Sequence, residues 1–223
     1  MTSGNPLGRL LESAGRGRFP AADMRVEVMA SPLGRADAVV AFSGHNIVAV
    51  PLHPAVVISH LPDDDPGAPV SALFLSWLGA TLGVVPGTLD LVMVGEGTGE
   101  PATELVPVAV DEHPRVVRAV THRSDITVHT DAEGDGVVIL GRGLAGRLEV
   151  SVEVAADRRS RGVGTSLARA ALGLARNGEL VWAQVSPGNV ASVRTFLRAG
   201  YRPVCSEVLF LRRASITPAE AAP

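Results

Sequence analysis

Hydrophobic and polar residues alternate most regularly over residues 147–164, which read RLEVSVEVAADRRSRGVG. The alternation has the period of a strand whose two faces differ. The apolar face is formed by Leu148, Val150, Val152 and Val154, and the polar face by Glu149, Ser151 and Glu153. A basic, glycine-bearing turn follows, and then a pattern typical of an amphipathic helix. The stretch therefore predicts a strand–turn–helix unit.

The rest of the second half has the same mixture of periods. A short helix is predicted at 112–123, followed by a hairpin of two strands around the turn AEGD. The elements after 123 are strands at 125–131, 135–143 and 146–154, a helix at 161–176, a strand at 179–185, a helix at 190–199 and a strand at 201–213. This order predicts an α/β fold, more narrowly an α+β mixed sheet with helices packed against it.

The first half is less regular. Leu7, Leu10 and Leu11 could support a short helix, but we expect most of residues 1–22 to be mobile and 214–223 to be a disordered tail. Between them, 23–111 should form an N-terminal α/β region, and 112–213 the core. The elements predicted within 23–111 are an edge strand at 23–30, strands in ADAVVAF and NIVAV around a turn at 43–45, a third apolar run PAVVISH at 54–60, a helix at 70–83 and a buried strand at 88–95. Ser71 and Gly83 are the expected caps of that helix.

Composition narrows the function classes. Of the residues, 46% are hydrophobic and only 4% aromatic, so Val, Leu and Ala must build the core of a globular protein. The net charge of −3 argues against a nucleic-acid partner. All basic residues are Arg, which excludes a lysine Schiff base and a P-loop lysine. Cys205 is the single cysteine, which excludes an internal disulfide and a cysteine-rich metal site.

Location and metal binding follow from similar arguments. No apolar run approaches the ~20 residues of a membrane span, and the first residues lack a signal-peptide layout. We therefore expect a cytoplasmic protein with no membrane partner. His45, His53 and His60 have no helical register that would bring them together, so no metal site is expected.

The turn at 159–164 has the chemistry of an anion site. Backbone N–H groups in the first turn of a helix lack internal partners, and the helix dipole favours negative charge there. Glycines let a phosphate approach the backbone. An ordinary solvated β-to-α turn with exposed arginines is the alternative interpretation of the turn taken alone.

Two sequence blocks resemble the GNAT superfamily of N-acetyltransferases. Arg159-Ser160-Arg161-Gly162-Val163-Gly164 is similar to its acetyl-CoA signature, (Gln/Arg)-x-x-Gly-x-(Gly/Ala). Asn189-Val190-Ala191-Ser192 and Leu197-Arg198-Ala199-Gly200-Tyr201 resemble its second block, an Asn near a helix start and a Gly-aromatic pair at the helix end. The resemblance covers roughly 112–213 and implies a GNAT-like acyl-CoA-binding fold with an N-terminal α/β extension.

The resemblance implies an acetyl-CoA-dependent N-acyltransferase in which an amine attacks the thioester directly, with acetyl-CoA as acyl donor and no metal. The pantetheine arm would pair with the strand before the loop, and the pyrophosphate would lie on the loop. The implied cofactor-binding residues are Val152, Glu153, Val154, Arg159, Ser160, Arg161, Gly162, Val163, Gly164, Thr165, Asn189 and Phe196.

The expected catalytic groups follow the superfamily's pattern less closely than the cofactor-binding residues do. Many members of the superfamily place a Tyr seven residues after the Asn as a general acid, but here that residue is Phe196, which cannot donate a proton. The predicted general base is Glu149, because Glu153 lies closer to the cofactor loop. The alternative interpretation of Glu149 is a surface-facing strand or an internal ion pair with an arginine such as Arg142 or Arg147. His122 and His129 are lower-ranked candidates.

A catalytically impaired CoA-binding regulatory or scaffold protein is the alternative function, and a non-CoA nucleotide-binding module is a third. Residues 23–111 are expected to shape the acceptor side, or to be a degenerate half-module packed on the core. The acceptor amine, the acyl length and the oligomeric state stay open, a homodimer being one option.

Overall fold

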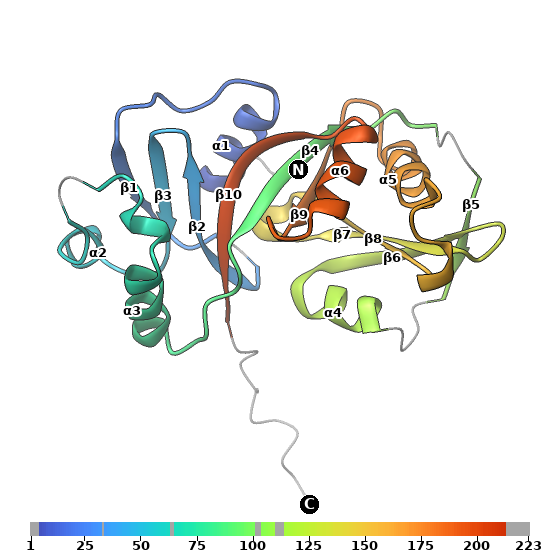
Figure 1. Ribbon diagram of the computed structural model, residues 1–223. Coiled ribbons are helices and arrows are strands. Elements are labelled where there is room, and N and C mark those ends of the chain that lie inside the picture. Colours follow the sequence, from blue (N-terminus) through green and yellow to red (C-terminus); the bar gives the residue numbers. More distant parts are fainter. Residues whose placement is uncertain (1–4, 33, 63–64, 101–103, 110–113, 213–223) are drawn as a thin grey trace, which may run out of the picture.

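The computed structural model describes residues 5–32, 34–62, 65–100, 104–109 and 114–212 (Figure 1). The helices are α1 (Pro6–Gly15), α2 (Pro54–Ile58), α3 (Ala72–Leu82), α4 (Pro114–His122), α5 (Val163–Leu174) and α6 (Val190–Arg198). The strands are β1 (Arg25–Met29), β2 (Ala36–Phe42), β3 (His45–Ala49), β4 (Asp90–Glu96), β5 (Leu105–Val108), β6 (Ser124–Asp131), β7 (Gly136–Arg142), β8 (Leu148–Val154), β9 (Leu180–Val185) and β10 (Arg202–Leu211). The predicted mixed α/β architecture is confirmed.

One sheet of ten strands runs through the described chain in the order β1-β3-β2-β10-β4-β9-β8-β7-β6-β5. Among the described strands, β1 with β3 and β8 with β9 run parallel, and the other neighbours run antiparallel. Long β10 joins the halves, because its first part pairs with β4 and its second part with β2. Strand β4 thus lies between β10 and β9, although it comes from the first half of the sequence.

The parallel pair β8 and β9 is joined only at its start. The register runs Leu148 with Val181 and Glu149 with Trp182, and stops there. Beyond this point β8 continues to Val154 and β9 to Val185 without a shared ladder. The edge of β8 that faces β9 is therefore left without a strand partner over most of its length.

Helices cover both faces of this part of the sheet, as Figure 1 shows for α4 and α5. Val138 and Val150 pack with α5 and α6 in one hydrophobic cluster. Ile139, which points to the other face, packs with Val116 and Ala119 of α4. Glu149 and Ser151 share the α4 face, since Ile139 lies directly opposite Ser151 in the β7–β8 ladder.

Two expectations for the first half are wrong. Within the segment expected to be mobile, Pro6–Gly15 forms α1, whose start is capped by Asn5 Oδ1 accepting from Leu7 N at 2.9 Å. Leu7 and Leu11 are fully buried in a cluster that includes Trp182, so apolar burial holds this helix in place. The run PAVVISH, expected to be a strand, forms α2, because Pro54 suits the first helical position and the His53 ring accepts from Ala55 N.

Other expectations are confirmed. The β2–β3 hairpin turns at Gly44, whose φ is +72°. Helix α3 begins after Ser71, which caps Phe74 N, and ends at left-handed Gly83. Strand β1 lies at the edge of the sheet. Strand β5 had no prediction, and the predicted tail at 214–223 lies outside the described residues.

Candidate active site

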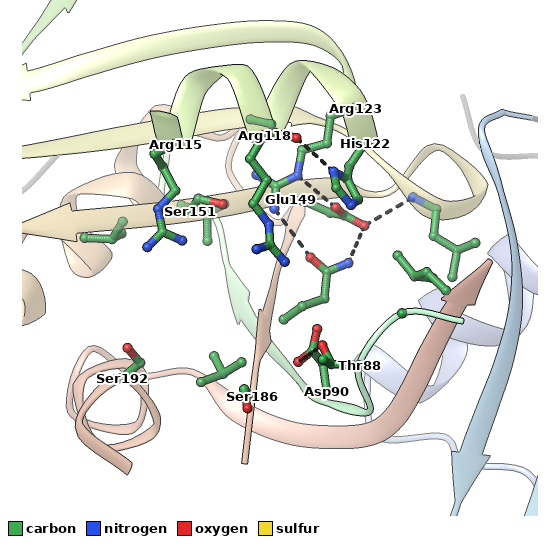
Figure 2. Close-up of a pocket in the computed structure, with 18 of the residues that line it drawn as sticks. Thr88, Asp90, Arg115, Arg118, His122, Arg123, Glu149, Ser151, Ser186 and Ser192 are labelled. Carbon is green, nitrogen blue, oxygen red and sulfur yellow. Dashed lines mark hydrogen bonds and ion pairs between the residues drawn. The ribbon is translucent and has the colours of Figure 1, made fainter. Parts of the chain in front are cut away.

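A cavity of about 410 Å³ lies where β8 and β9 separate. Figure 2 shows its walls, which come from β8, the end of β9, α4, α6 and the start of β4. Both faces of β8 contribute, because Val150 and Val152 belong to the α5 face and Glu149 and Ser151 to the α4 face. The cavity therefore reaches through the sheet, from the side of α6 to the side of α4.

The separated strand edge suits an extended amide-bearing ligand. An edge strand without a partner presents N–H and C=O groups that can pair with another chain. Of the three predicted backbone contacts on β8, Val152 lines the cavity, while Glu153 and Val154 continue the edge toward the loop. The Glu153 side chain points instead to Arg115 of α4, whose Nε donates to its Oε2 at 2.8 Å.

The predicted phosphate loop precedes α5 and leaves backbone donors available. Gly162 adopts φ +87° at the N-cap position and provides no side-chain cap. Its carbonyl accepts from the amides of Thr165 and Ser166, the normal start of an α-helix. The amides of Val163 and Gly164 come earlier in the first turn and have no intrahelical acceptor. A helix start of this kind can bind an anion.

The side chains around this loop differ in the contacts that they make. Arg158, which was not among the predicted contacts, is paired with Asp135. Arg159 and Arg161 are exposed, and Arg159 Nε donates to Val154 O at 3.2 Å. Ser160 takes a left-handed φ of +63°, which turns the chain into the helix. None of the loop residues 159–165 lines the cavity. The residues of β8 that line it, 149–152, come before the loop in the sequence.

Helix α6 supplies the opposite wall. Asn189 caps this helix, with its Oδ1 accepting from Ser192 N at 3.1 Å, and both residues line the cavity. Phe196 also lines it and packs edge-on against Tyr201, with ring centroids 4.9 Å apart. Tyr201 donates to Ala168 O at 3.2 Å, and burial raises the pKa of its hydroxyl. Tyr201 therefore serves packing, and Phe196 brings an apolar ring to the cavity.

Glu149, the predicted base, lies at the narrow end where β8 and β9 are still paired. Its carboxylate accepts from Arg123 Nε at 2.9 Å, Arg147 Nε at 2.8 Å, Gln184 Nε2 at 2.9 Å and Leu144 N at 3.2 Å. Burial by itself raises the pKa of Glu149, but the charges and hydrogen bonds of Arg147 and Arg123 hold it below its ordinary value. A carboxylate in this state is a weak proton acceptor.

A second buried carboxylate completes this network. Arg147 also binds both carboxylate oxygens of Glu207 on β10, and its guanidinium lies 5.4 Å from the centre of the Trp182 ring. Gln184 bridges the two glutamates, donating to Glu207 Oε1 at 3.0 Å. The arginines Arg123 and Arg147 balance the two glutamates in charge, and this polar cluster ties β8, β9 and β10 together.

Asp90, at the start of β4, is a carboxylate in the cavity wall that sequence reasoning missed. It lies opposite Glu207 in the β4–β10 ladder and accepts a long hydrogen bond of 3.4 Å from Thr88. Burial, followed by the negative charge of Glu207, raises the pKa of Asp90. The available signal was a lone acidic residue in the otherwise apolar run TLDLVMVG.

Helix α4 turns a basic face to the cavity. Arg115, Arg118 and His122 follow helical spacing and line the same wall, as Figure 2 shows. The His122 Nδ1 lies 2.8 Å from Arg118 O, so this nitrogen donates its proton to that carbonyl. His129, the other histidine considered as base, lies on β6 outside the cavity, and burial lowers its pKa.

Residues 124–201 match the family model described as the acetyltransferase (GNAT) family. The resemblance to the GNAT family is confirmed. This GNAT segment, residues 124–201, contains the separated strands β8 and β9, the glycine-bearing loop and α6. The match supports acyl-CoA-dependent acyl transfer in general terms.

Solved structures of GNAT proteins are similar to this chain. A GCN5-related N-acetyltransferase from Kribbella flavida is 17% identical, with a TM-score of 0.41, covering 64% of this chain and 65% of its own. A GCN5-related N-acetyltransferase from Sphaerobacter thermophilus is 18% identical, with a TM-score of 0.39, covering 64% of this chain and 56% of its own. The chain thus spans less than two thirds of either protein. No curated protein matches the sequence.

Within the described ranges, no group of three or more His, Cys, Asp or Glu side chains is arranged to hold a metal ion. Of the helices that the structure describes, none combines the length and apolar character needed to cross a membrane.

Proposed function

We propose that the protein transfers an acetyl group from acetyl-CoA to the nitrogen of an amine. The observation that carries the proposal is the separation of β8 from β9 above a cavity, directly before a helix start with available amides, within the GNAT segment. In this proposal the amides of Val163 and Gly164 bind the pyrophosphate, with Arg159 and Arg161 close by.

The acyl-bearing arm then follows the open edge of β8. Backbone groups of Val152, Glu153 and Val154 pair with its amides, and Asn189 and Phe196 border it from α6. This path delivers the thioester to the middle of the cavity, where residues of both sheet faces meet. The acceptor enters from the α4 side, so donor and acceptor approach from opposite faces of the sheet.

Proton removal from the acceptor is assigned to Asp90 in this proposal. The amine must lose a proton before its lone pair can attack the thioester carbon. Asp90 has a raised pKa and one long hydrogen bond, which suits a base. Glu149 was predicted for this role, but its described hydrogen bonds and lowered pKa favour a positioning role, in which it holds Arg123 and Gln184 at the cavity wall.

The reaction balances without a further reagent. The amine nitrogen forms a bond to the acyl carbon, the carbon–sulfur bond breaks, and the sulfur leaves with the electron pair as a thiolate. An acceptor that arrives as an ammonium ion gives its first proton to Asp90, which passes it to solvent. After the attack the nitrogen loses its second proton to water, and the thiolate takes up a proton from water, since Phe196 has none to donate. The apolar ring of Phe196 lines the cavity beside the arm.

Ligand-induced stabilisation tests the cofactor part of the proposal. Acetyl-CoA at 100 times its Kd adds about 2.7 kcal/mol to the unfolding free energy, which raises Tm in a thermal scan. Adenosine triphosphate serves as the control, because it has phosphates but no pantetheine arm. An unchanged Tm at millimolar acetyl-CoA, or equal shifts by both ligands, would contradict the proposal.

A CoA-binding protein without chemistry is the second candidate, favoured by Phe196 at the position of the family's proton donor. The two functions differ in thiol release. An acetyltransferase releases free CoA from acetyl-CoA when an amine panel is added, whereas a binding protein shows the Tm shift and no amine-dependent thiol release.

A further inference from the structure

The walls of the cavity carry opposite charges on its α4 side. Arg115, Arg118 and His122 line one wall, and Asp90 lies across from them with Thr88, as Figure 2 shows. Arg118 and Asp90 are close enough that the positive charge of Arg118 lowers the proton affinity of the Asp90 carboxylate. The space between them is therefore polar at both ends.

Most of the positive charge near this wall is neutralised by ion pairs. Arg115 is paired with Glu153, and Arg123 and Arg147 are balanced by Glu149 and Glu207. Among the described residues, the Arg118 guanidinium makes no hydrogen bond or ion pair, and its charge acts on Asp90 across the cavity. Arg118 is exposed and lines the cavity, so its guanidinium is accessible to a ligand.

A second observation at the same wall concerns Arg123. This residue is 7% exposed and lines the cavity, yet its Nη1 has no hydrogen-bond partner among the described residues. That nitrogen is itself inaccessible, and the charge of Arg123 is balanced by Glu149, so Arg123 is a structural part of the wall. The arginine of this wall that a ligand can reach is Arg118.

We infer that the acceptor is a small zwitterionic amine of the free amino-acid class, whose carboxylate binds at Arg118 and whose amine lies on the Asp90 side. This inference rests on the proposed function and names the substrate class of the same site. A carboxylate pairs with a guanidinium in two parallel hydrogen bonds and carries the single negative charge that matches Arg118. The cavity volume of about 410 Å³ fits a small molecule.

Binding of the carboxylate at Arg118 also orients the amine of the acceptor. With the carboxylate held at the α4 wall, the amine is aimed toward the separated strands, where the thioester is proposed to lie. An amine without the carboxylate would forgo the two hydrogen bonds to the Arg118 guanidinium. The site should therefore select against such amines.

The test compares free amino acids with their α-carboxamides and with the matching aminophosphonic acids. Each compound is titrated into the full chain with and without CoA, and is also assayed as acceptor with acetyl-CoA. At least one amino acid should bind, and react with a kcat/KM at least about tenfold above that of its carboxamide. In Arg118→Gln this preference should fall to about threefold or less, whereas Arg118→Lys should retain part of it.

Arg9→Gln is the matched control, because Arg9 is an exposed arginine on α1, outside the cavity. It should keep the full preference. Carboxamides accepted as well as the free acids would overturn the inference, as would stronger binding of the aminophosphonic acids throughout, or no binding of any free amino acid. Acetyl-CoA binding is scored separately, so loss of the proposed function is distinguished from loss of this inference.

Discussion

Two carboxylates line the cavity, and their surroundings differ. Glu149 accepts four hydrogen bonds, two of them from buried arginines. Asp90 has one long hydrogen bond and a like charge, Glu207, as its ladder partner. The same chemical group is thus stabilised as an anion at Glu149 and destabilised as an anion at Asp90. Sequence position alone does not distinguish a structural carboxylate from a reactive one, whereas the number of donors around it does.

The largest expected effect is on activity and distinguishes Asp90 from Glu149. Asp90→Asn keeps the shape of the side chain but removes the base, so kcat should fall by about 10²–10⁴-fold. Removing a charge opposite Glu207 relieves repulsion, so the unfolding free energy should not decrease. Steady-state kinetics and urea unfolding of the same preparation measure both. Unchanged kcat would return the role of base to Glu149.

The second largest expected effect is on stability and concerns Glu149. Glu149→Gln leaves Arg123 and Arg147 buried with one balancing carboxylate instead of two, which should cost about 3–5 kcal/mol of unfolding free energy. Because the pKa of Glu149 is lowered in the folded protein, its stabilisation is present above the ordinary pKa of 4.5 and is lost as the pH falls below it. The variant should therefore lose most stability near neutral pH, and the difference from the natural chain should shrink in acid. A variant as stable as the natural chain at pH 7 would contradict the positioning role.

A third variant tests the cofactor loop apart from either carboxylate. A Cβ at Gly164 would lie 3.4 Å from Thr195 and Val154 carbons, an ordinary contact, so Gly164→Ala should fold and bind acetyl-CoA. Gly164→Glu adds a negative charge at the proposed pyrophosphate site and should weaken acetyl-CoA binding by about tenfold or more. Titration calorimetry of both variants measures the difference. Equal affinities would mean that the phosphates bind elsewhere.

The smallest expected effect concerns the pKa of Asp90. The Thr88 hydroxyl lowers the pKa of Asp90 slightly through its hydrogen bond. Thr88→Val removes that bond, so the acid limb of the kcat/KM profile should move to higher pH by less than about one unit. Thr81→Val is the control, since the Thr81 hydroxyl bonds only a backbone carbonyl of its own helix among the described residues. A shift to lower pH in Thr88→Val would argue against Asp90 as the titrating group.

Local patterns predicted much of the fold. The alternation of β8, the caps of α3 and the glycine-bearing loop depend on neighbours in sequence, and each appears where the residues indicate it. The pairing of Arg147 with Glu207 and of Arg123 with Gln184 depends on strand order and register across about half of the sheet, which no local pattern encodes. Asp90 was missed for the same reason, because β4 joins the sheet beside β9 and far from its sequence neighbours.

The position of β4 also bears on how the chain folds. Residues 90–96 fill the gap between β9 and β10, so the GNAT segment cannot close its own sheet. Cut out on its own, it would leave the edge of β9 open to pairing with other molecules, the usual route to aggregation. During synthesis β4 must wait for about 90 more residues before either neighbour exists, which makes its pairing a late, long-range step. The carboxylate that it carries to the cavity thus reaches its place only after β9 and β10 have been made.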